Sequence, residues 1–417
     1  MYLADVTKGA KVRGGSLRRV ATGNVLALGL VSLFTDVSAE MVTAVLPAFL
    51  VLGLHLSVAQ YGVLDGLYTG ATALTRLLGG YLADRFQRRK AVAIVGYGLS
   101  AVAKLGLLGA TTGGSIGAVI ALDRTGKGIR TAPRDALIAH SVDERDLGQA
   151  FGVHRAMDSV GAFLGPLAAL ALLALAGGPD YGVVFVGSLC IAMVGLVLLA
   201  LFVREPRAGG AGSGTADEPP VLSPRGRLRA HRLLAAGTFR RLCVVAALLG
   251  LVTVGDGFVY LVLQDRDDLP VRAFPLLAVG TSLAFLVLAV PLGRLADRVG
   301  RWPVVVMGYA CLLTVYLLLS SGTGPLWLIL GLYGAFYAAT DGVLSALAVP
   351  LIPEALRTTG LALLQTGQAL AYFASSVLFG LLWQQAGVQV ACLAAAGSAV
   401  LLLPLCALLL RQREAVG

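Results

Sequence analysis

Charged residues are scarce in this sequence. Asp, Glu, Lys and Arg make up 13% of its 417 residues, and apolar residues make up 57%. Charged residues form roughly a quarter of an ordinary soluble chain. A soluble protein of this length needs more charge to cover its surface, which excludes a soluble enzyme and a disordered interaction chain. The mean hydropathy of +0.83 instead predicts a protein that faces lipid.

Motifs for several common chemistries are also lacking. The five cysteines show no C-x-x-C spacing, so we expect neither disulfides nor metal ligands. No GxxxxGK[ST] phosphate-binding loop occurs, which argues against ATP as an energy source. No Ser-His-Asp or paired-His motif stands in a convincing context. We therefore expect no enzyme activity, no cofactor and no bound metal.

Long apolar segments are abundant, and a membrane-spanning helix needs about 20 mostly apolar residues. Segments of this kind occupy 22–52, 61–82, 91–110, 148–175, 181–203, 241–264, 273–296, 303–320, 326–350, 360–383 and 388–410.

The segment 115–139 is doubtful as a span because it carries several charged residues. The basic loops at 85–90 and 298–301 should both be cytoplasmic, which requires an even number of spans between them. Keeping 115–139 satisfies this condition, so we predict that it crosses the membrane sheltered from lipid. The prediction is then an all-α protein with twelve spans and cytoplasmic termini in a bacterial inner (plasma) membrane. The net charge of +10 becomes a positive-inside bias and needs no nucleic-acid partner.

An internal repeat divides the chain. Gly-Tyr-Leu-Ala-Asp-Arg at 80–85 recurs as Gly-Arg-Leu-Ala-Asp-Arg at 293–298. We therefore predict two pseudo-symmetric six-helix bundles, which fit an alternating-access transporter. The predicted division is a cytoplasmic N-tail 1–20, a bundle 21–203, a polar cytoplasmic linker 204–237, a bundle 238–410 and a cytoplasmic C-tail 411–417.

On these residues the chain resembles the major facilitator superfamily along essentially its whole length. The resemblance implies a cytoplasmic gating motif, present twice, at Gly80, Asp84, Arg85, Arg88, Gly293, Asp297, Arg298 and Arg301.

Two further motifs carry functional implications of this resemblance. Gly161, Gly165 and Pro166 are similar to a fifth-helix motif of exporters, although the paired glycines that usually follow are absent. The run D-R-x-G-K-G-x-R-x-A-P-R-D over 123–135 is similar to a signature of a bacterial permease subgroup. Its opening Asp123-Arg124 and Gly128 resemble a motif of proton-coupled members.

A stripe of charge lies on the predicted fourth helix. Asp123, Lys127, Arg130 and Arg134 are separated by four, three and four residues, which places them on one helix face. Each isolated base at a helix centre costs about 2.5–3.5 kcal/mol, so these bases need partners or water. The predicted proton-coupling and charge network comprises Asp36, Glu40, Asp65, Asp123, Arg124, Lys127, Arg130 and Asp158.

Three interpretations of this network remain open. A carboxylate could exchange a proton during transport, the bases could bind an anionic substrate, or the network could be a static set of salt bridges. Few charges lie at comparable depth in the second bundle, so we expect it to supply mainly substrate contacts. The candidates are Asp256, Tyr260, Tyr333, Tyr337, Asp341, Gln365, Gln368 and Tyr372.

The sequence thus predicts a secondary active transporter, with proton-coupled export of a small organic solute by an antiporter as the main hypothesis. Its partners would be the solute, protons and the lipid bilayer, and we expect a monomer. One alternative is proton-coupled uptake, or transport of an anion or a metal complex. Another is a membrane sensor or scaffold that moves no solute.

Overall fold

The structure is a computed structural model. It describes residues 23–86, 88–143, 146–178, 180–205, 233, 235, 237–353 and 356–411. The side chains of 76–86, 343, 357–359, 410 and 411 lie outside this description. The predicted N-tail, most of the linker and all of the C-tail beyond residue 411 also lie outside it. Every regular element in the described ranges is helical, which agrees with the predicted all-α class.

The first half contributes α2 (Gly23–Ala48), continued by η1 (Phe49–Gly53), and then α3 (Val58–Phe86), α4 (Arg89–Gly109), α5 (Gly113–Ala139), α6 (Leu147–Leu175) and α7 (Tyr181–Phe202). The second half contributes α9 (Gly237–Val252), α10 (Asp256–Arg266), η3 (Val271–Ala273), α11 (Pro275–Val299), α12 (Arg301–Ser321), α13 (Leu326–Thr340), α14 (Val343–Ala348), η4 (Val349–Leu351), α15 (Arg357–Ala386) and α16 (Val388–Arg411).

The apolar composition explains both the length of these helices and their exposed surfaces. Large apolar side chains such as Leu175 and Leu201 are 84% and 71% exposed, as expected for helices that face lipid. Glycines with positive φ end α11, α12 and α15, at Gly300, Gly322 and Gly387.

Ten segments of the described chain are long and apolar enough to cross a membrane, and α3 and α5 are not among them. These two helices correspond to the predicted spans 61–82 and 115–139. They are long, with 29 and 27 residues, but α3 carries four charged residues and α5 carries six. Both are sheltered by neighbours, because α5 packs against α3 and α4, and α3 packs against α15. The total of twelve spans therefore stays a prediction.

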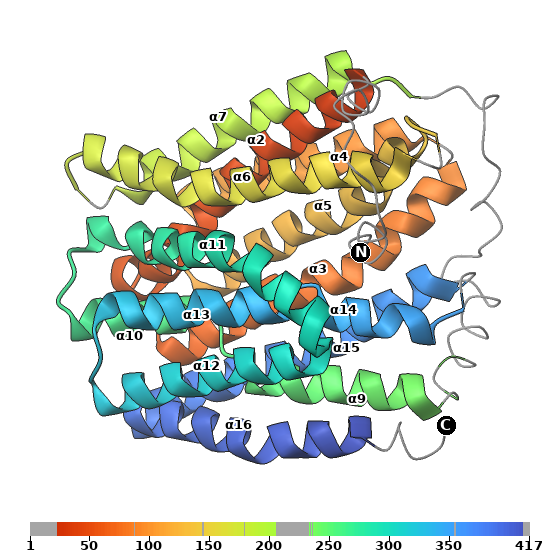
Figure 1. The fold of residues 1–417 in the computed structure, drawn as a ribbon. Helices are drawn as coiled ribbons and strands as arrows, with labels where there is room; N and C mark the ends of the chain where they lie inside the picture. The colour runs from red at the N-terminus through yellow and green to blue at the C-terminus, as the bar shows by residue number, and fades with distance from the viewer. Residues whose placement is uncertain are drawn as a thin grey trace.

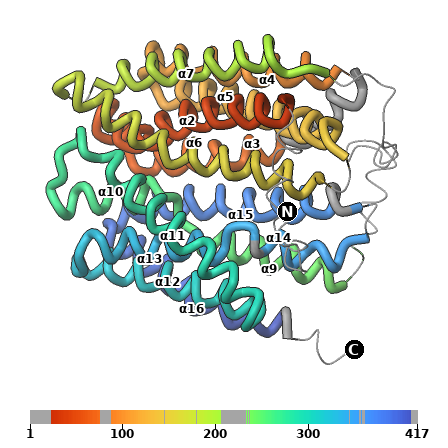
Figure 2. The backbone as a smooth tube through the Cα atoms, turned by 45° about the horizontal axis from the view of Figure 1, so that its top comes forward, coloured from red at the N-terminus to blue at the C-terminus, as the bar shows by residue number. Residues whose placement is uncertain are grey.

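The two halves form two stacked layers of roughly parallel helices (Figures 1 and 2). Helices α2–α7 pack mainly against one another, as do α9–α16. The layers meet where α3 runs along α15 and where α6 contacts α11. This arrangement supports two bundles, while the exact domain boundaries stay predictions because residues 206–232 lie outside the description.

The ends of the first half are tied together. The Asn24 amide donates to the Arg204 carbonyl (3.1 Å), and its oxygen accepts from the Arg204 amide nitrogen (2.8 Å). The start of α2 and the end of α7 thus lie at the same end of the bundle, here named the linker end. The opposite end, with the turns after η1, α4, α6 and α10, is the far end.

A break interrupts the helix pair α9–α10 at 253–255. Tyr316 of α12 satisfies two backbone groups at the break. Its hydroxyl accepts from the Val254 amide (2.9 Å) and donates to the Val252 carbonyl (2.8 Å). Backbone groups without partners are costly in a membrane interior. The fold therefore stabilises this break by providing hydrogen-bond partners for its backbone.

Candidate functional site

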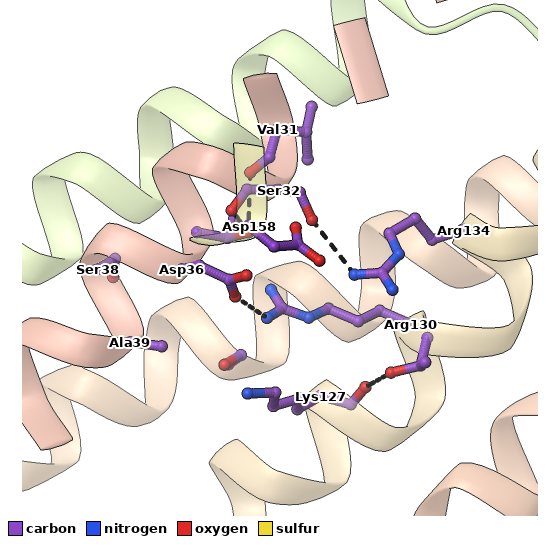
Figure 3. Close-up of polar contacts among 12 residues, drawn as sticks. Val31, Ser32, Asp36, Ser38, Ala39, Lys127, Arg130, Arg134 and Asp158 are labelled. Atoms are coloured by element: carbon purple, nitrogen blue, oxygen red, sulfur yellow. Dashed lines mark hydrogen bonds and ion pairs between the residues drawn. The ribbon is translucent and has the colours of Figure 1, made fainter. Parts of the chain in front are cut away.

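The charged fourth helix forms as predicted. Segment 115–139 lies within α5, whose first turn is closed by a reciprocal capping box between Thr112 and Ser115. The bases extend from α5 toward α2, as Figure 3 shows for Lys127, Arg130 and Arg134. The stripe thus faces protein.

Asp123 is the anchor of the stripe. Its carboxylate accepts from Arg124 Nε (2.8 Å) and from Nη2, and it also accepts from the Ser100 hydroxyl of α4. Lys104 Nζ lies 3.8 Å from Asp123 Oδ1. The Arg124 guanidinium lies over the Tyr68 ring at 3.6 Å, a cation–π contact. One carboxylate thus serves two buried cations.

Arg130 and Arg134 have separate partners. Arg130 Nη2 lies 3.9 Å from Asp36 Oδ1 (Figure 3). Its guanidinium also covers the Tyr97 ring at 4.2 Å. Arg134 bonds its neighbour Asp135 (2.9 Å) and donates to the Ser32 hydroxyl at 3.2 Å. The Asp158 carboxylate lies 3.2 Å from His154 Nδ1, one turn away on α6.

Lys127 and Glu40 differ from this pattern. Among the residues that the structure describes, neither side chain makes an ion pair within 4 Å or a hydrogen bond. They interact with each other at longer range, and Asp36 also acts on both. Within the described part of the chain, Lys127 is therefore the base of the stripe that lacks a direct counter-ion.

A cavity of about 290 Å³, lined in part by Lys127, lies between the two halves. The first half lines it with Tyr68, Thr69, Thr72, Ala73, Arg124 and Lys127, and the second half with Ala362, Gln365, Thr366 and Ala369. Its volume is close to the lower end of the range for small-molecule sites, about 300–1,000 Å³. The cavity brings the predicted charge network and one predicted substrate residue, Gln365, to the same place.

Asp65 does not join the stripe on α5 but bridges the two halves. Its Oδ2 accepts from the Tyr372 hydroxyl (2.9 Å) and the Ser376 hydroxyl (2.6 Å) of α15. Nearby, the Tyr61 ring of α3 packs edge-on against Phe258 of α10, with centroids 4.8 Å apart. These contacts close the interface on the far-end side of the cavity, since α3 begins and α15 ends at that end.

Asp256 forms a second polar cluster at the start of α10. Its Oδ1 accepts from the Tyr337 hydroxyl and from the Tyr333 hydroxyl (3.3 Å), which also reaches the Val254 carbonyl at 3.0 Å. Three of the predicted substrate residues therefore meet beside the broken helix, although none of them lines the 290 Å³ cavity.

The other predicted substrate residues are scattered. Tyr260 is buried against Phe274 with centroids 6.3 Å apart, Asp341 is exposed at the end of α13, and Gln368 is partly buried on α15. The Tyr372 hydroxyl donates a hydrogen bond to Asp65. Their roles in binding stay predictions.

Comparison with known proteins decides the family. The family model described as Major Facilitator Superfamily matches residues 28–279 and 267–417. The chain belongs to the Major Facilitator Superfamily. An "uncharacterized MFS-type transporter" of Methanocaldococcus jannaschii is 29% identical over 384 residues, which cover 88% of this chain and 90% of that protein. An uncharacterized protein of Mycobacterium tuberculosis is 27% identical over 369 residues, covering 86% of each.

Solved structures share the fold. The nucleoside transporter NupG matches with a TM-score of 0.74 and 15% identity, over 93% of this chain and 99% of that one. A POT family transporter in complex with a thioalcohol conjugated peptide matches with a TM-score of 0.76 and 14% identity, over 94% and 96%. The family match, together with ten apolar helical segments in the described chain, makes this member of the superfamily a multi-span membrane protein of a transporter family, and no enzymatic family is indicated.

The superfamily gating motif is only partly visible. The burial of Gly80 and the side chains of Asp84 and Arg85 lie outside the description, while Arg88 is exposed before α4. In the second copy, Gly293, Asp297 and Arg298 are exposed, and Arg301 donates to the Ala346 carbonyl at 2.5 Å. A gating role for these residues stays a prediction.

The motif at Gly161, Gly165 and Pro166 is buried where α6 crosses α2. A Cβ atom on Gly165 would lie 2.9 Å from the Val37 carbonyl oxygen, and one on Gly161 would lie 2.7 Å from that of Leu33. Both glycines thus allow α6 to approach the helix that carries Asp36 and Glu40.

Sequence reasoning missed several partners in this site. Tyr68 and Tyr97 lie under the guanidinium groups, and Ser100 and Ser376 each donate to a carboxylate. A signal existed for Tyr68, because it lies three residues after Asp65 and four before Thr72, on one helix face. The serines gave no such signal.

Proposed function

We propose that this chain is a secondary transporter that moves a small organic solute by alternating access, coupled to protons. One observation carries the proposal: the 290 Å³ cavity lies between the two halves and takes wall residues from both. A site shared by two bundles changes when one bundle rocks against the other. Twelve spans, with the linker and both termini in the cytoplasm, complete the proposed topology.

The contacts around the cavity support an alternating mechanism. Asp65 and Tyr61 join the halves on the far-end side, through Tyr372, Ser376 and Phe258. Residues 68–73 and 362–369, which line the cavity, lie nearer the linker end along α3 and α15. In the proposed cycle, the solute enters and leaves the cavity from the linker end while the far-end contacts are intact. When these contacts break, the cavity opens to the far end.

We assign proton exchange to Asp36 and Glu40. Both lie on α2 near Lys127, and neither is enclosed by donors as Asp123 is. A carboxylate with few fixed donors can gain and lose a proton with little rearrangement of its neighbours. Protonation of either group weakens its attraction for Lys127 and so changes the charge beside the cavity.

The direction of transport rests on separate observations. Gly161, Gly165 and Pro166 favour export by antiport, through their similarity to the exporter motif. A second candidate is uptake of an anionic solute together with protons. Lys127 favours it, because protonation of Glu40 or Asp36 would remove a negative charge near Lys127 and so strengthen the attraction of Lys127 for an anion.

A solute screen in vesicles with an imposed pH gradient tests the proposal. Purified wild-type chain should concentrate at least one small solute when the gradient is applied, and the sign of accumulation gives the direction. Glu40→Gln and Asp36→Asn should lose accumulation but keep solute exchange at equal pH on both sides. Asp265→Asn, at an exposed far-end position, serves as the matched control.

Two results would contradict the proposal. One is the absence of movement for every solute tested, with folded protein correctly inserted in the vesicles. This result would favour a sensor or scaffold. The other is accumulation that remains unchanged in Asp36→Asn, Glu40→Gln and the double variant, which would remove these carboxylates from the coupling mechanism.

A further inference from the structure

The charges beside the cavity do not balance pair by pair. Asp123 serves both Arg124 and Lys104, and Asp36 is the partner of Arg130. Lys127 then remains without an ion pair in the described part of the chain. Lys127 is half-buried, and a charge withdrawn from bulk water without a close partner is costly, so its retention needs a reason.

Asp36 and Glu40 are the acids that compensate Lys127, but both act on it at longer range. Neither carboxylate forms an ion pair with Lys127 within 4 Å in the described structure. Lys127, in contrast, lines the cavity directly, and Glu40 does not. An anion in the cavity would therefore be the first direct partner of the Lys127 ammonium.

The rest of the cavity wall suits the same class of ligand. Arg124 adds a second positive charge, and its contacts with Asp123 and Tyr68 fix its position. Thr72, Gln365 and Thr366 supply neutral hydrogen-bonding groups. The described residues that line the cavity include no Asp or Glu. A cation would thus meet two bases and no acid on this surface.

We propose that the transported solute carries a carboxylate, and that Lys127 is the residue that binds it. This inference rests on the proposed function, since it names the substrate class of the same cavity. Lys127 contributes a compact charge on a flexible side chain, and Arg124 contributes a fixed one. The second half orients the body of the solute through Gln365 and Thr366. The volume of about 290 Å³ limits that body to a small molecule.

Small probes that differ only in their head group test this specificity directly. The probes are benzoate, benzamide and benzylamine, and hexanoate with its amide and amine, added to the purified full chain. Carboxylates should raise the thermal unfolding temperature of wild type. They should lose this effect in Lys127→Gln but keep it in Arg155→Gln, which removes an exposed charge from α6. Stabilisation by amines or amides alone, or a carboxylate effect that survives Lys127→Gln, would overturn the proposal.

A second experiment needs no ligand. A cysteine at position 362, in Ala362→Cys, is exposed to anionic and cationic methanethiosulfonate reagents, and its peptide is followed by mass spectrometry. Relative to a free thiol in solution, the anionic reagent should react faster than the cationic one. This preference should fall about tenfold when Lys127→Gln is added, and it should be unchanged by Arg155→Gln. A preference for the cationic reagent, or no effect of Lys127, would overturn the proposal even if no probe raises the unfolding temperature.

The two failures can be told apart. A carboxylate that binds through Lys127 but never crosses the vesicle membrane would contradict the transport function and leave the specificity intact. A neutral or cationic solute that is transported equally well by wild type and Lys127→Gln would contradict the carboxylate specificity and leave the transport function intact.

Discussion

At the scale of single residues, the site contains several bases that share a small number of carboxylates. The spacing of Asp123, Lys127, Arg130 and Arg134 was sufficient to predict one charged helix face, and the structure confirms that the face points into protein. The pairing could not be predicted, because spacing along one helix does not reveal which neighbouring helix supplies a partner. Asp65 illustrates this, since it lies in the same half as the bases yet bonds α15.

Asp123→Asn should destabilise the protein strongly. The substitution removes the one carboxylate shared by Arg124 and Lys104, and leaves two buried cations without their partner. Breaking a buried ion pair costs about 3–5 kcal/mol, so the loss should appear as a marked fall in the thermal unfolding temperature. Asp135→Asn is the matched control, because the Asp135 side chain is 43% exposed and its pair with Arg134 is partly solvated. Equal effects of both variants would contradict the anchoring role of Asp123.

At the scale of elements, the close packing of α6 against α2 positions the helix that carries Asp36 and Glu40. The sequence motif at Gly161 and Gly165 was identified by resemblance to exporters, and the structure adds a packing reason for both glycines. That reason could not be derived from the sequence, because the crossing of α6 over α2 is a tertiary feature. The break between α9 and α10 was also not predicted, since 241–264 is one continuous apolar run.

Gly165→Ala should lower stability by about 1–3 kcal/mol, the usual cost of overpacking. The added methyl group would overlap the backbone of α2 near Val37 and Glu40. Gly152→Ala on the same helix is the control, because a Cβ atom there meets nothing within 4 Å. This control should be neutral or stabilising by up to about 1 kcal/mol through helix propensity. Thermal unfolding of the two variants compares them directly, and an unaffected Gly165→Ala would refute the close packing.

Tyr316→Phe tests the repair of the broken helix. Loss of the hydroxyl leaves the Val254 amide without its acceptor and removes a hydrogen bond to the Val252 carbonyl. The expected cost is about 1–3 kcal/mol, because an unsatisfied buried group bears its full desolvation penalty. Tyr181→Phe is the control, since the buried Tyr181 hydroxyl has no hydrogen-bond partner in the described structure. Hydrogen exchange at Val254 should increase in the first variant alone.

At the scale of the whole molecule, two bundles meet around a shared cavity. The internal repeat and the family resemblance were sufficient to predict this architecture, which the superfamily match and the structural neighbours support. The sequence assigned substrate contacts mainly to the second half. The cavity differs, because Tyr68, Arg124 and Lys127 of the first half form much of its wall. Which residues line the same cavity becomes known only when the two halves are assembled.

Asp65→Ala should shift the conformational equilibrium. The variant loses two hydrogen bonds from α15 to a carboxylate at the far-end side of the interface. Hydrogen bonds to charged groups contribute about 1.5–3 kcal/mol, so the population with an open far end should rise about tenfold or more. Spin labels at Gln60→Cys and Gln385→Cys should report a longer distance in this variant. Asp265→Ala, at the same end but not between the halves, should leave the distance distribution unchanged, and identical distributions in all three proteins would argue against the bridge.

The pairing of Asn24 with the backbone of Arg204 has a consequence for chain connectivity. Since the amide of one residue contacts the main chain of the other at 2.8 Å and 3.1 Å, the two ends of the first half are adjacent in space. A short peptide could therefore join them directly, and new termini could be opened in a turn at the opposite end. Such a circular permutant of the first half, coexpressed with the second half, would reveal whether the order of the helices along the chain matters for assembly.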